Sequence, residues 1–166
     1  MNGSVDIRAC TTADLALLQR RWATQSGVHE AHHARQLDGG ATYLVAWEDA
    51  EPLGAGVVNW GGCIGPRARE AFPAAVEIHH LQVRDEYRGR GVGSALIAAA
   101  ERMALHSGRR QTAVGVADDN PRAERLYLRL GYRRTGVIDF SEYDWTASDG
   151  TVHHAVECDQ LLLKDH

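Results

Sequence analysis

Three glycines at alternate positions, Gly89, Gly91 and Gly93, lie between an apolar segment and a stretch with helical periodicity. Glycine lets the backbone approach a ligand closely, and the free amides and dipole at a helix N-terminus favour a bound anion. Arg88 and Arg90 add fork-shaped cationic donors beside the same turn. This composition predicts a phosphate or pyrophosphate site, although a tight strand–helix turn without a ligand would carry the same glycines.

Two familiar phosphate-binding loops do not fit this segment. Ser94 stands where the dinucleotide fingerprint G-x-G-x-x-G needs its third glycine. A P-loop requires a lysine directly after its last glycine, whereas the only lysine of the chain is Lys164. The glycine turn is therefore neither a dinucleotide fingerprint nor a P-loop.

The segment before the glycine turn, residues 76–83, alternates like a β-strand but changes phase. Its apolar residues are Val76 and Ile78, then Leu81 and Val83. A one-residue shift of this kind is typical of a β-bulge, which re-aims side chains and is common beside functional sites. A strand buried on both faces would tolerate the same pattern, so both interpretations stand at this point.

The remaining hydrophobic pattern alternates strands with helices and ends in two strands. We predict strands over residues 5–9, 42–47, 53–60, 76–83, 111–117, 132–140 and 152–163, helices over 12–22, 28–37, 92–107 and 121–130, and a Gly- and Pro-rich loop over 61–73. This order predicts an α/β (α+β) fold with a mixed sheet and helices on both faces. The 166 residues suffice for one domain, which we place over residues 1–166.

Composition narrows the class of protein further. The net charge of −4 at pH 7 argues against a generally basic nucleic-acid-binding protein. The most apolar stretch, residues 96–100, is far shorter than a membrane span, and residues 1–6 lack the basic and apolar regions of a signal peptide. Three cysteines without CxxC spacing indicate buried thiols in a reducing compartment. We therefore expect a cytoplasmic protein with no membrane or nucleic-acid partner.

Two longer motifs include and follow the glycine turn. The first is Leu81-x-Val83-x-x-x-Tyr87-Arg88-Gly89-Arg90-Gly91-Val92-Gly93-x-x-Leu96. The second is Asn120-x-x-Ala123-x-x-Leu126-Tyr127-x-x-x-Gly131-Tyr132. In their order and spacing they resemble the two signature motifs of the GCN5-related N-acetyltransferase (GNAT) superfamily.

This resemblance implies an acetyl-CoA-dependent N-acetyltransferase with no metal cofactor, which moves the acetyl group directly to a primary amine. It also implies a mostly antiparallel central sheet, whose bulged fourth strand is splayed and leaves its backbone free for the pantetheine arm. The residues implied to bind the cofactor are Leu81, Gln82, Val83, Arg88, Gly89, Arg90, Gly91, Val92, Gly93, Ser94, Asn120 and Tyr127. Members are often homodimers, so a homodimer is one of the implied assemblies.

The resemblance also implies two catalytic side chains. Glu77 matches the position of a carboxylate that acts as general base in many members, and its apolar neighbours would raise its pKa. His79 or His80 is the alternative base, because a neutral imidazole is available at pH 7. A structural Glu77 paired with an arginine is a third alternative. Tyr127 matches the tyrosine that protonates the departing thiolate, and the Leu81 N–H would stabilise the oxyanion.

The charge distribution suggests where an amine would bind. Residues 135–163 include six Asp or Glu and no Lys or Arg, whereas 13 of the 17 arginines lie within residues 67–134. Glu142, Tyr143 and Asp144 form an acidic and aromatic segment that would attract and stack on a small cationic amine. A solvated acidic loop is the alternative interpretation, and the sequence does not fix the identity of the acceptor.

Two other functions are compatible with parts of this sequence. His29-Glu30-Ala31-His32-His33 satisfies H-E-x-x-H, the zinc-binding helix of a hydrolase. The extended zinc-protease pattern fails at Gln36 and Gly39, where it needs glycine and histidine, so we expect a polar helix near the acceptor entrance instead. The other alternative is an acetyl-CoA-binding sensor without turnover; the presence of both Glu77 and Tyr127 favours an enzyme.

Overall fold

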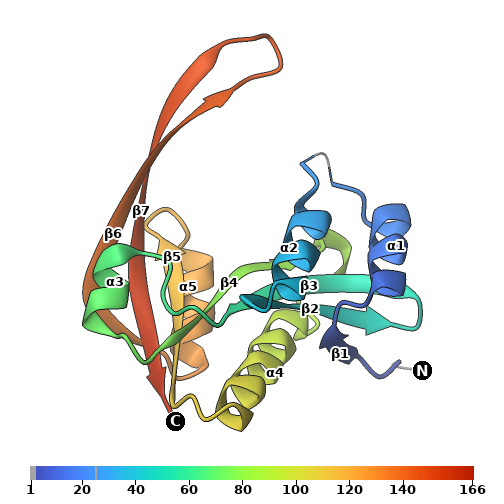
Figure 1. The fold of residues 1–166 in the computed structure, drawn as a ribbon, viewed down its shortest axis with the longest axis horizontal. Helices are drawn as coiled ribbons and strands as arrows, with labels where there is room; N and C mark the ends of the chain where they lie inside the picture. Colours follow the sequence, from blue (N-terminus) through green and yellow to red (C-terminus); the bar gives the residue numbers. More distant parts are fainter. Residues whose placement is uncertain (1–2, 25) are drawn as a thin grey trace.

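The computed structural model describes residues 3–24 and 26–166. They form one seven-stranded sheet in the order β1-β2-β3-β4-β5-β7-β6 (Figure 1). Neighbouring strands are antiparallel except for β4 and β5, which are parallel. The strands are β1 Asp6–Ala9, β2 Ala41–Glu48, β3 Glu51–Asn59, β4 Val76–Val83, β5 Gln111–Ala117, β6 Arg133–Thr146 and β7 Val152–Asp165. The predicted mixed, mostly antiparallel sheet is confirmed.

Helices cover both faces of this sheet, as predicted. They are α1 Thr12–Arg21, α2 Val28–Leu37, α3 Pro66–Ala71, α4 Val92–His106 and α5 Pro121–Arg129, with a short 3-10 turn over Asp85–Tyr87. Figure 1 shows α1 and α2 on one side of β2 and β3, and α4 on the other. In the part of the chain that the structure describes, no helix is both long and apolar enough to cross a membrane.

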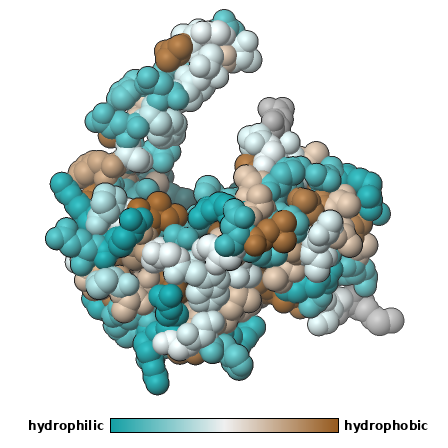
Figure 2. All heavy atoms as spheres, viewed as in Figure 1, coloured by the Kyte–Doolittle hydropathy of each residue, from teal (hydrophilic) through white to brown (hydrophobic). Residues whose placement is uncertain are grey.

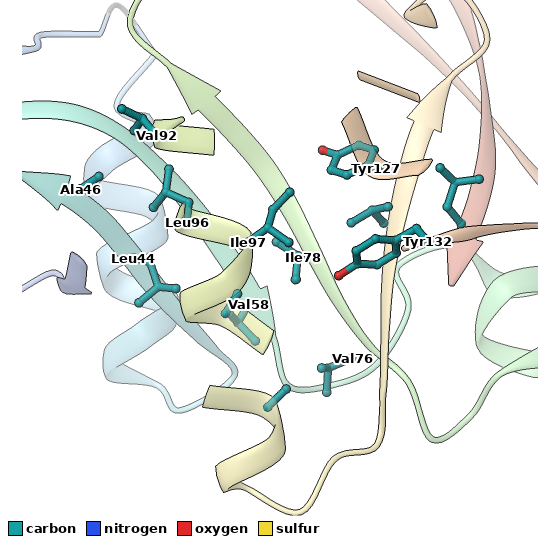
Figure 3. Close-up of a cluster of buried hydrophobic side chains, with 14 of the residues drawn as sticks. Leu44, Ala46, Val58, Val76, Ile78, Val92, Leu96, Ile97, Tyr127 and Tyr132 are labelled. Carbon is teal, nitrogen blue, oxygen red and sulfur yellow. The ribbon is translucent and has the colours of Figure 1, made fainter. Parts of the chain in front are cut away.

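The alternation of side chains along the strands divides the core into separate clusters. On β2, Leu44 faces α4 and packs with Leu96 and Ile97 (Figure 3). Tyr43 and Trp47 of the same strand point to the opposite face, which α1 covers. A third cluster lies under α3 and joins it to β5 and β7. Each helix therefore covers one set of alternate strand positions.

The predicted bulge is present in β4. His80 and Leu81 together face the single residue Gly56 of β3, and His80 has a φ of +49°, in the left-handed region that side chains rarely adopt. β3 has two glycines, Gly54 and Gly56, beside and opposite the bulge. A Cβ at Gly54 would lie 2.7 Å from the carbonyl oxygen of Gln82. The glycines of β3 thus make room for the distortion of β4.

β4 and β5 separate after only two paired positions. Val76 pairs with Thr112 and Glu77 with Ala113, and the later residues of β4 have no partner on β5. Backbone groups on this side of β4 are therefore available to a ligand. The predicted splayed fourth strand is confirmed.

The last two strands continue beyond the body of the protein. β5 pairs with β7 only as far as Asp159, so residues 140–158 form a two-stranded ribbon of their own, which we call the arm (Figure 1). The prediction that β6 ends at Phe140 is wrong, because pairing continues to Thr146. Cross-strand hydrogen bonds satisfy the backbone of the arm without burial of its side chains. The hydrophobic pattern therefore does not reveal that β6 continues beyond Phe140.

Residues 61–73 contain the second difference from the predicted elements. Pro66–Ala71 form α3, so this segment is only partly loop. Pro66 stands at the start of the helix, where its missing N–H costs nothing. The prediction of a loop rests on the Gly and Pro content of the whole segment, which does not reveal a helix that begins at a proline. The other predicted elements are confirmed to within two residues at each end.

Candidate active site

A cavity of about 610 Å³ lies where β4 and β5 separate. Its walls come from the second half of β4, the glycine turn, the first turn of α4, and α5. Eleven of the twelve predicted cofactor-binding residues line it: Leu81, Gln82, Val83, Arg88, Gly89, Gly91, Val92, Gly93, Ser94, Asn120 and Tyr127. The twelfth, Arg90, lies outside this lining, with its guanidinium 5.4 Å from the centre of the Tyr87 ring. The fold therefore gathers two separate motifs around one space.

The glycine turn presents free amides to this cavity. Gly89 and Gly91 both have a φ of +79°, a conformation that favours glycine. The first bond of the helical ladder runs from Ala95 N–H to the Gly91 carbonyl, at 3.0 Å. The amides of residues 92–94 come before it, and no side chain of the described residues caps them. These donors and the helix dipole form a site for an anion.

Three arginines that sequence reasoning missed also line the cavity. Arg122, Arg125 and Arg129 project from α5. Their spacing of three and four residues places them on one helix face, which was visible in the sequence. Only the fold shows that this face points to the same cavity as the glycine turn. The site therefore carries more positive charge than predicted.

Asn120, the N-cap of α5, and Tyr127, in its second half, both line the cavity. The Asn120 Oδ1 accepts a hydrogen bond from the Ala123 amide at 3.2 Å, so its own NH₂ group is left for another partner. Tyr127 is 8% exposed and packs edge-on against Tyr132, with its hydroxyl toward β4 in Figure 3. Burial raises the pKa of the Tyr127 hydroxyl. The phenol therefore keeps its proton at neutral pH and can donate it.

Glu77 lies on the face of β4 opposite α4 and is 6% exposed. Burial raises the pKa of its carboxyl to about 7, and the negative charges of Asp159 and Asp139 act in the same direction, while a hydrogen bond from the Ile64 backbone opposes them. The expected desolvation of Glu77 is thus present. Leu81 follows four residues later along β4, beyond the bulge, so the Glu77 carboxyl and the Leu81 amide lie at different points of the strand.

A second cavity, of about 230 Å³, meets the first at the bulge. Leu81 and Gln82 line both. The predicted alternative base His80 also lines the second cavity, whereas His79 lies beside it. Burial lowers the pKa of His79 to about 3, so its ring is neutral at physiological pH.

The H-E-x-x-H segment forms α2, but its first histidine has a structural role. His29 Nδ1 lies 2.7 Å from the Tyr43 hydroxyl, and Nε2 donates to the Trp22 carbonyl, also at 2.7 Å. Both ring nitrogens are therefore engaged. Within residues 3–24 and 26–166, no group of three His, Cys, Asp or Glu side chains is arranged to hold a metal ion. The geometry does not favour a zinc hydrolase.

The predicted acceptor-binding residues all lie on the arm. Glu142 and Asp144 both face His154, with oxygen–nitrogen distances of 3.8 and 2.8 Å. The Tyr143 hydroxyl donates to Glu157 at 2.8 Å. None of the three is among the described residues that line either cavity. Figure 2 shows a hollow between the arm and the body of the molecule.

Residues 11–132 match the model of the acetyltransferase (GNAT) family, which is well over half of the chain. The chain belongs to the GNAT family. The predicted resemblance is therefore confirmed. The matched region of this GNAT domain contains the glycine turn, both cavities and α5, and it ends before the arm.

Relatives agree with this membership. An uncharacterised N-acetyltransferase of Methanocaldococcus jannaschii is 40% identical over 98 residues, which are 58% of this chain and 41% of the relative. An N-acetyltransferase from Staphylococcus aureus Mu50 superposes with a TM-score of 0.68 at 16% identity, over 98% of each chain. A GNAT family acetyltransferase from Elizabethkingia anophelis with acetyl-CoA bound gives 0.62 at 16% identity, again over 98% of each chain. The structures confirm the GNAT fold.

Proposed function

We propose that this GNAT chain is an N-acetyltransferase that moves an acetyl group from acetyl-CoA directly to the primary amine of a small cationic acceptor. The larger cavity carries the proposal. The free amides of residues 92–94, the edge of Leu81–Val83 that has no partner on β5, and Tyr127 all border it. The acetyl-CoA in the related Elizabethkingia structure supports the same cosubstrate here.

The residues around the cavity suit the parts of acetyl-CoA. Its pyrophosphate would accept hydrogen bonds from the amides of residues 92–94, with the helix dipole behind them. The arginines of α5 would neutralise the remaining phosphate charge. The amide groups of the pantetheine arm would pair with the free edge of β4, as an added strand does. Binding requires no metal ion.

The reaction then needs a base, an oxyanion donor and an acid. Glu77 accepts the ammonium proton through water, and the free amine attacks the thioester carbonyl to form the C–N bond. The Leu81 N–H stabilises the oxyanion. When the C–S bond breaks, Tyr127 donates its proton to the departing thiolate, and the second proton that the nitrogen loses returns to the Tyr127 oxygen. The products are the N-acetylated amine and CoA.

Replacing Glu77 with glutamine tests the base. A carboxyl with a pKa of about 7 accepts a proton only above that pH, so the wild-type kcat/KM should rise with pH through about 7. Glu77→Gln should lower the rate at pH 7 by about a hundred-fold. The deficit should shrink at higher pH, because more of the amine is already neutral. The measurement is kcat/KM from pH 5.5 to 9.5.

Glu70→Gln is the matched control for this profile, since Glu70 is an exposed carboxylate on α3. Its profile should coincide with that of the wild type. An unchanged profile in Glu77→Gln would remove Glu77 from the proton path and leave His79, His80 or the absence of a dedicated base as the alternatives.

The decisive test of the function is CoA release in the presence of a panel of primary amines. A thiol-detecting assay should show release that depends on both acetyl-CoA and an amine. A sensor of the same fold would bind acetyl-CoA and release no CoA with any amine. Binding without release across the panel would therefore reject the enzyme and favour the sensor.

The acidic arm is part of this proposal, as the element that attracts the cationic acceptor. Neutralising Glu142→Gln and Asp144→Asn together should raise the KM for the amine about two- to five-fold and leave the KM for acetyl-CoA unchanged. The wild-type KM for the amine should also rise with salt. Steady-state kinetics at two ionic strengths measure both effects.

The control removes the same charge elsewhere. Glu48→Gln with Asp49→Asn changes two carboxylates at the β2–β3 turn, and it should leave both KM values unchanged. An equal rise in the control, or a KM independent of salt, would assign the arm to solubility alone.

The cysteines support a cytoplasmic location for this activity. Cys10, Cys63 and Cys158 are all free thiols, and the first two are buried. Free thiols persist in reducing compartments. The net charge of −4 further supports a small molecule as acceptor, and not a nucleic acid.

A further inference from the structure

The smaller cavity has an unusual lining for an amine site. Five rings border it, those of Trp22, His29, His32, Tyr43 and His80. None of its nine described lining residues carries a carboxylate, an ammonium or a guanidinium group. At about 230 Å³ it is smaller than the roughly 300–1,000 Å³ typical of sites for drug-sized ligands. We call it the histidine pocket.

Two histidines of α2 in this pocket differ in their hydrogen bonds. Both ring nitrogens of His29 are satisfied by Tyr43 and Trp22. His32 also lies on α2 and is only 7% exposed. Neither of its ring nitrogens has a hydrogen-bond partner among residues 3–24 and 26–166. Buried polar groups are rarely left unpaired in proteins unless a ligand or water completes them. The ring nitrogens of His32 are therefore available to a ligand or to water, as are those of the neighbouring His79, whereas those of His29 are engaged.

The bulge places a second imidazole opposite His32. His80 adopts its left-handed conformation, with a φ of +49°, and its ring centre lies 4.8 Å from that of His32. A side chain held in such a conformation is a recurrent feature of ligand sites. Leu81, the next residue, also borders the larger cavity. The imidazole pair thus lies next to the position at which the two cavities meet.

We propose that the histidine pocket binds the amine acceptor, and that the acceptor is a small primary monoamine with a compact apolar or aromatic body. This inference rests on the proposed function. The amino group would lie beside the paired rings of His32 and His80 and next to Leu81, where it can reach the thioester. Trp22 and Val28 would contact the apolar body.

The charges around the pocket favour one amino group over several. Arg35 lies close enough to lower the pKa of His32, His79 and His80, with burial as the larger cause for each. A second ammonium would feel the same positive charge and would find no carboxylate in the lining. The single ammonium that does enter loses its proton more readily, since an uncharged pocket disfavours the charged form. The neutral imidazoles can accept its N–H bonds.

His32→Phe is the sharpest test, because it keeps the ring and removes both nitrogens. With phenethylamine as the probe, the KM for the amine should rise about ten-fold or more, and the KM for acetyl-CoA should stay within two-fold. His33→Phe is the matched control, since His33 is a neighbouring histidine with the same 7% exposure that does not line the pocket. Its KM for phenethylamine should be unchanged. Melting temperatures establish that both variants are folded.

Filling the pocket gives a second test that does not depend on hydrogen bonds. Val28→Trp adds a large ring at the rim, and Leu37→Trp adds the same ring at the exposed other end of α2. Only Val28→Trp should weaken the binding of phenethylamine. In the wild type, phenethylamine should have a higher kcat/KM than the polyamine spermidine.

Calorimetric binding of phenethylamine in the presence of CoA separates this inference from the proposed function. Saturable binding that His32→Phe and Val28→Trp weaken would support the pocket even if no CoA release were observed with any amine. CoA release that neither variant alters would leave the enzyme intact and overturn the pocket. Absence of saturable binding, or a preference for spermidine, would also overturn it.

Discussion

Gly91→Asp should abolish the stabilisation that acetyl-CoA gives to the wild-type protein. Gly91 is the N-cap of α4, and a carboxylate there would lie beside the amides that we assign to the pyrophosphate. A ligand that binds only the native state at a hundred times its Kd adds about 2.7 kcal/mol to the free energy of unfolding. For a domain of this size that is a rise in Tm of roughly 5–10 °C. Thermal melts with and without acetyl-CoA measure it.

Gly91→Asn is the matched control for this experiment. Asparagine and aspartate have almost the same shape, and both tolerate the φ of +79° better than other side chains. Both variants should therefore lose a similar amount of intrinsic stability. Only the aspartate adds negative charge, so Gly91→Asn should keep most of the shift in Tm. If Gly91→Asp kept it too, the glycine turn would not hold the phosphates.

The features that the sequence predicted well are those that neighbouring residues determine. Asn120 and Pro121 specify a helix start through a side-chain cap and a fixed φ. The change of phase between Ile78 and Leu81 indicates a bulge, because side chains alternate strictly along a strand. The glycine turn is equally local. These signals predicted the order of the elements, and the resemblance to the GNAT superfamily added both motifs of the larger cavity.

Features that depend on contacts between residues far apart in the sequence could not be predicted from such local patterns. His32 and His80 come from α2 and β4, and only the packing of the helix on the sheet brings their rings together. The three arginines of α5 share a helix face in the sequence, but the cavity that they face requires β4 to separate from β5. The arm extends β6 by pairing alone, without the burial that a hydrophobic pattern records.

Tyr127→Phe should lower kcat far more than it changes the affinity for acetyl-CoA. The leaving thiolate develops late in the reaction, so its proton donor acts on the transition state and not on the bound ground state. General acids contribute about 10²–10⁴-fold to a rate, and we expect a loss in that range. Steady-state kcat and the KM for acetyl-CoA test it. Full activity would mean that water or the substrate supplies the proton.

Tyr132→Phe provides a control in the opposite direction. The Tyr132 hydroxyl donates to Glu101 at 2.9 Å and lies 3.0 Å from Thr112 Oγ1. The Tyr127 hydroxyl forms no hydrogen bond with a described residue, and burial alone raises its pKa. Tyr132→Phe should therefore cost about 1 kcal/mol of stability with kcat nearly unchanged. Tyr127→Phe should leave stability nearly unchanged and reduce kcat. The two tyrosines, whose rings are in contact, would thus have different roles. Tyr132 would stabilise the fold and Tyr127 would act in catalysis, because only the Tyr127 hydroxyl is free for the substrate.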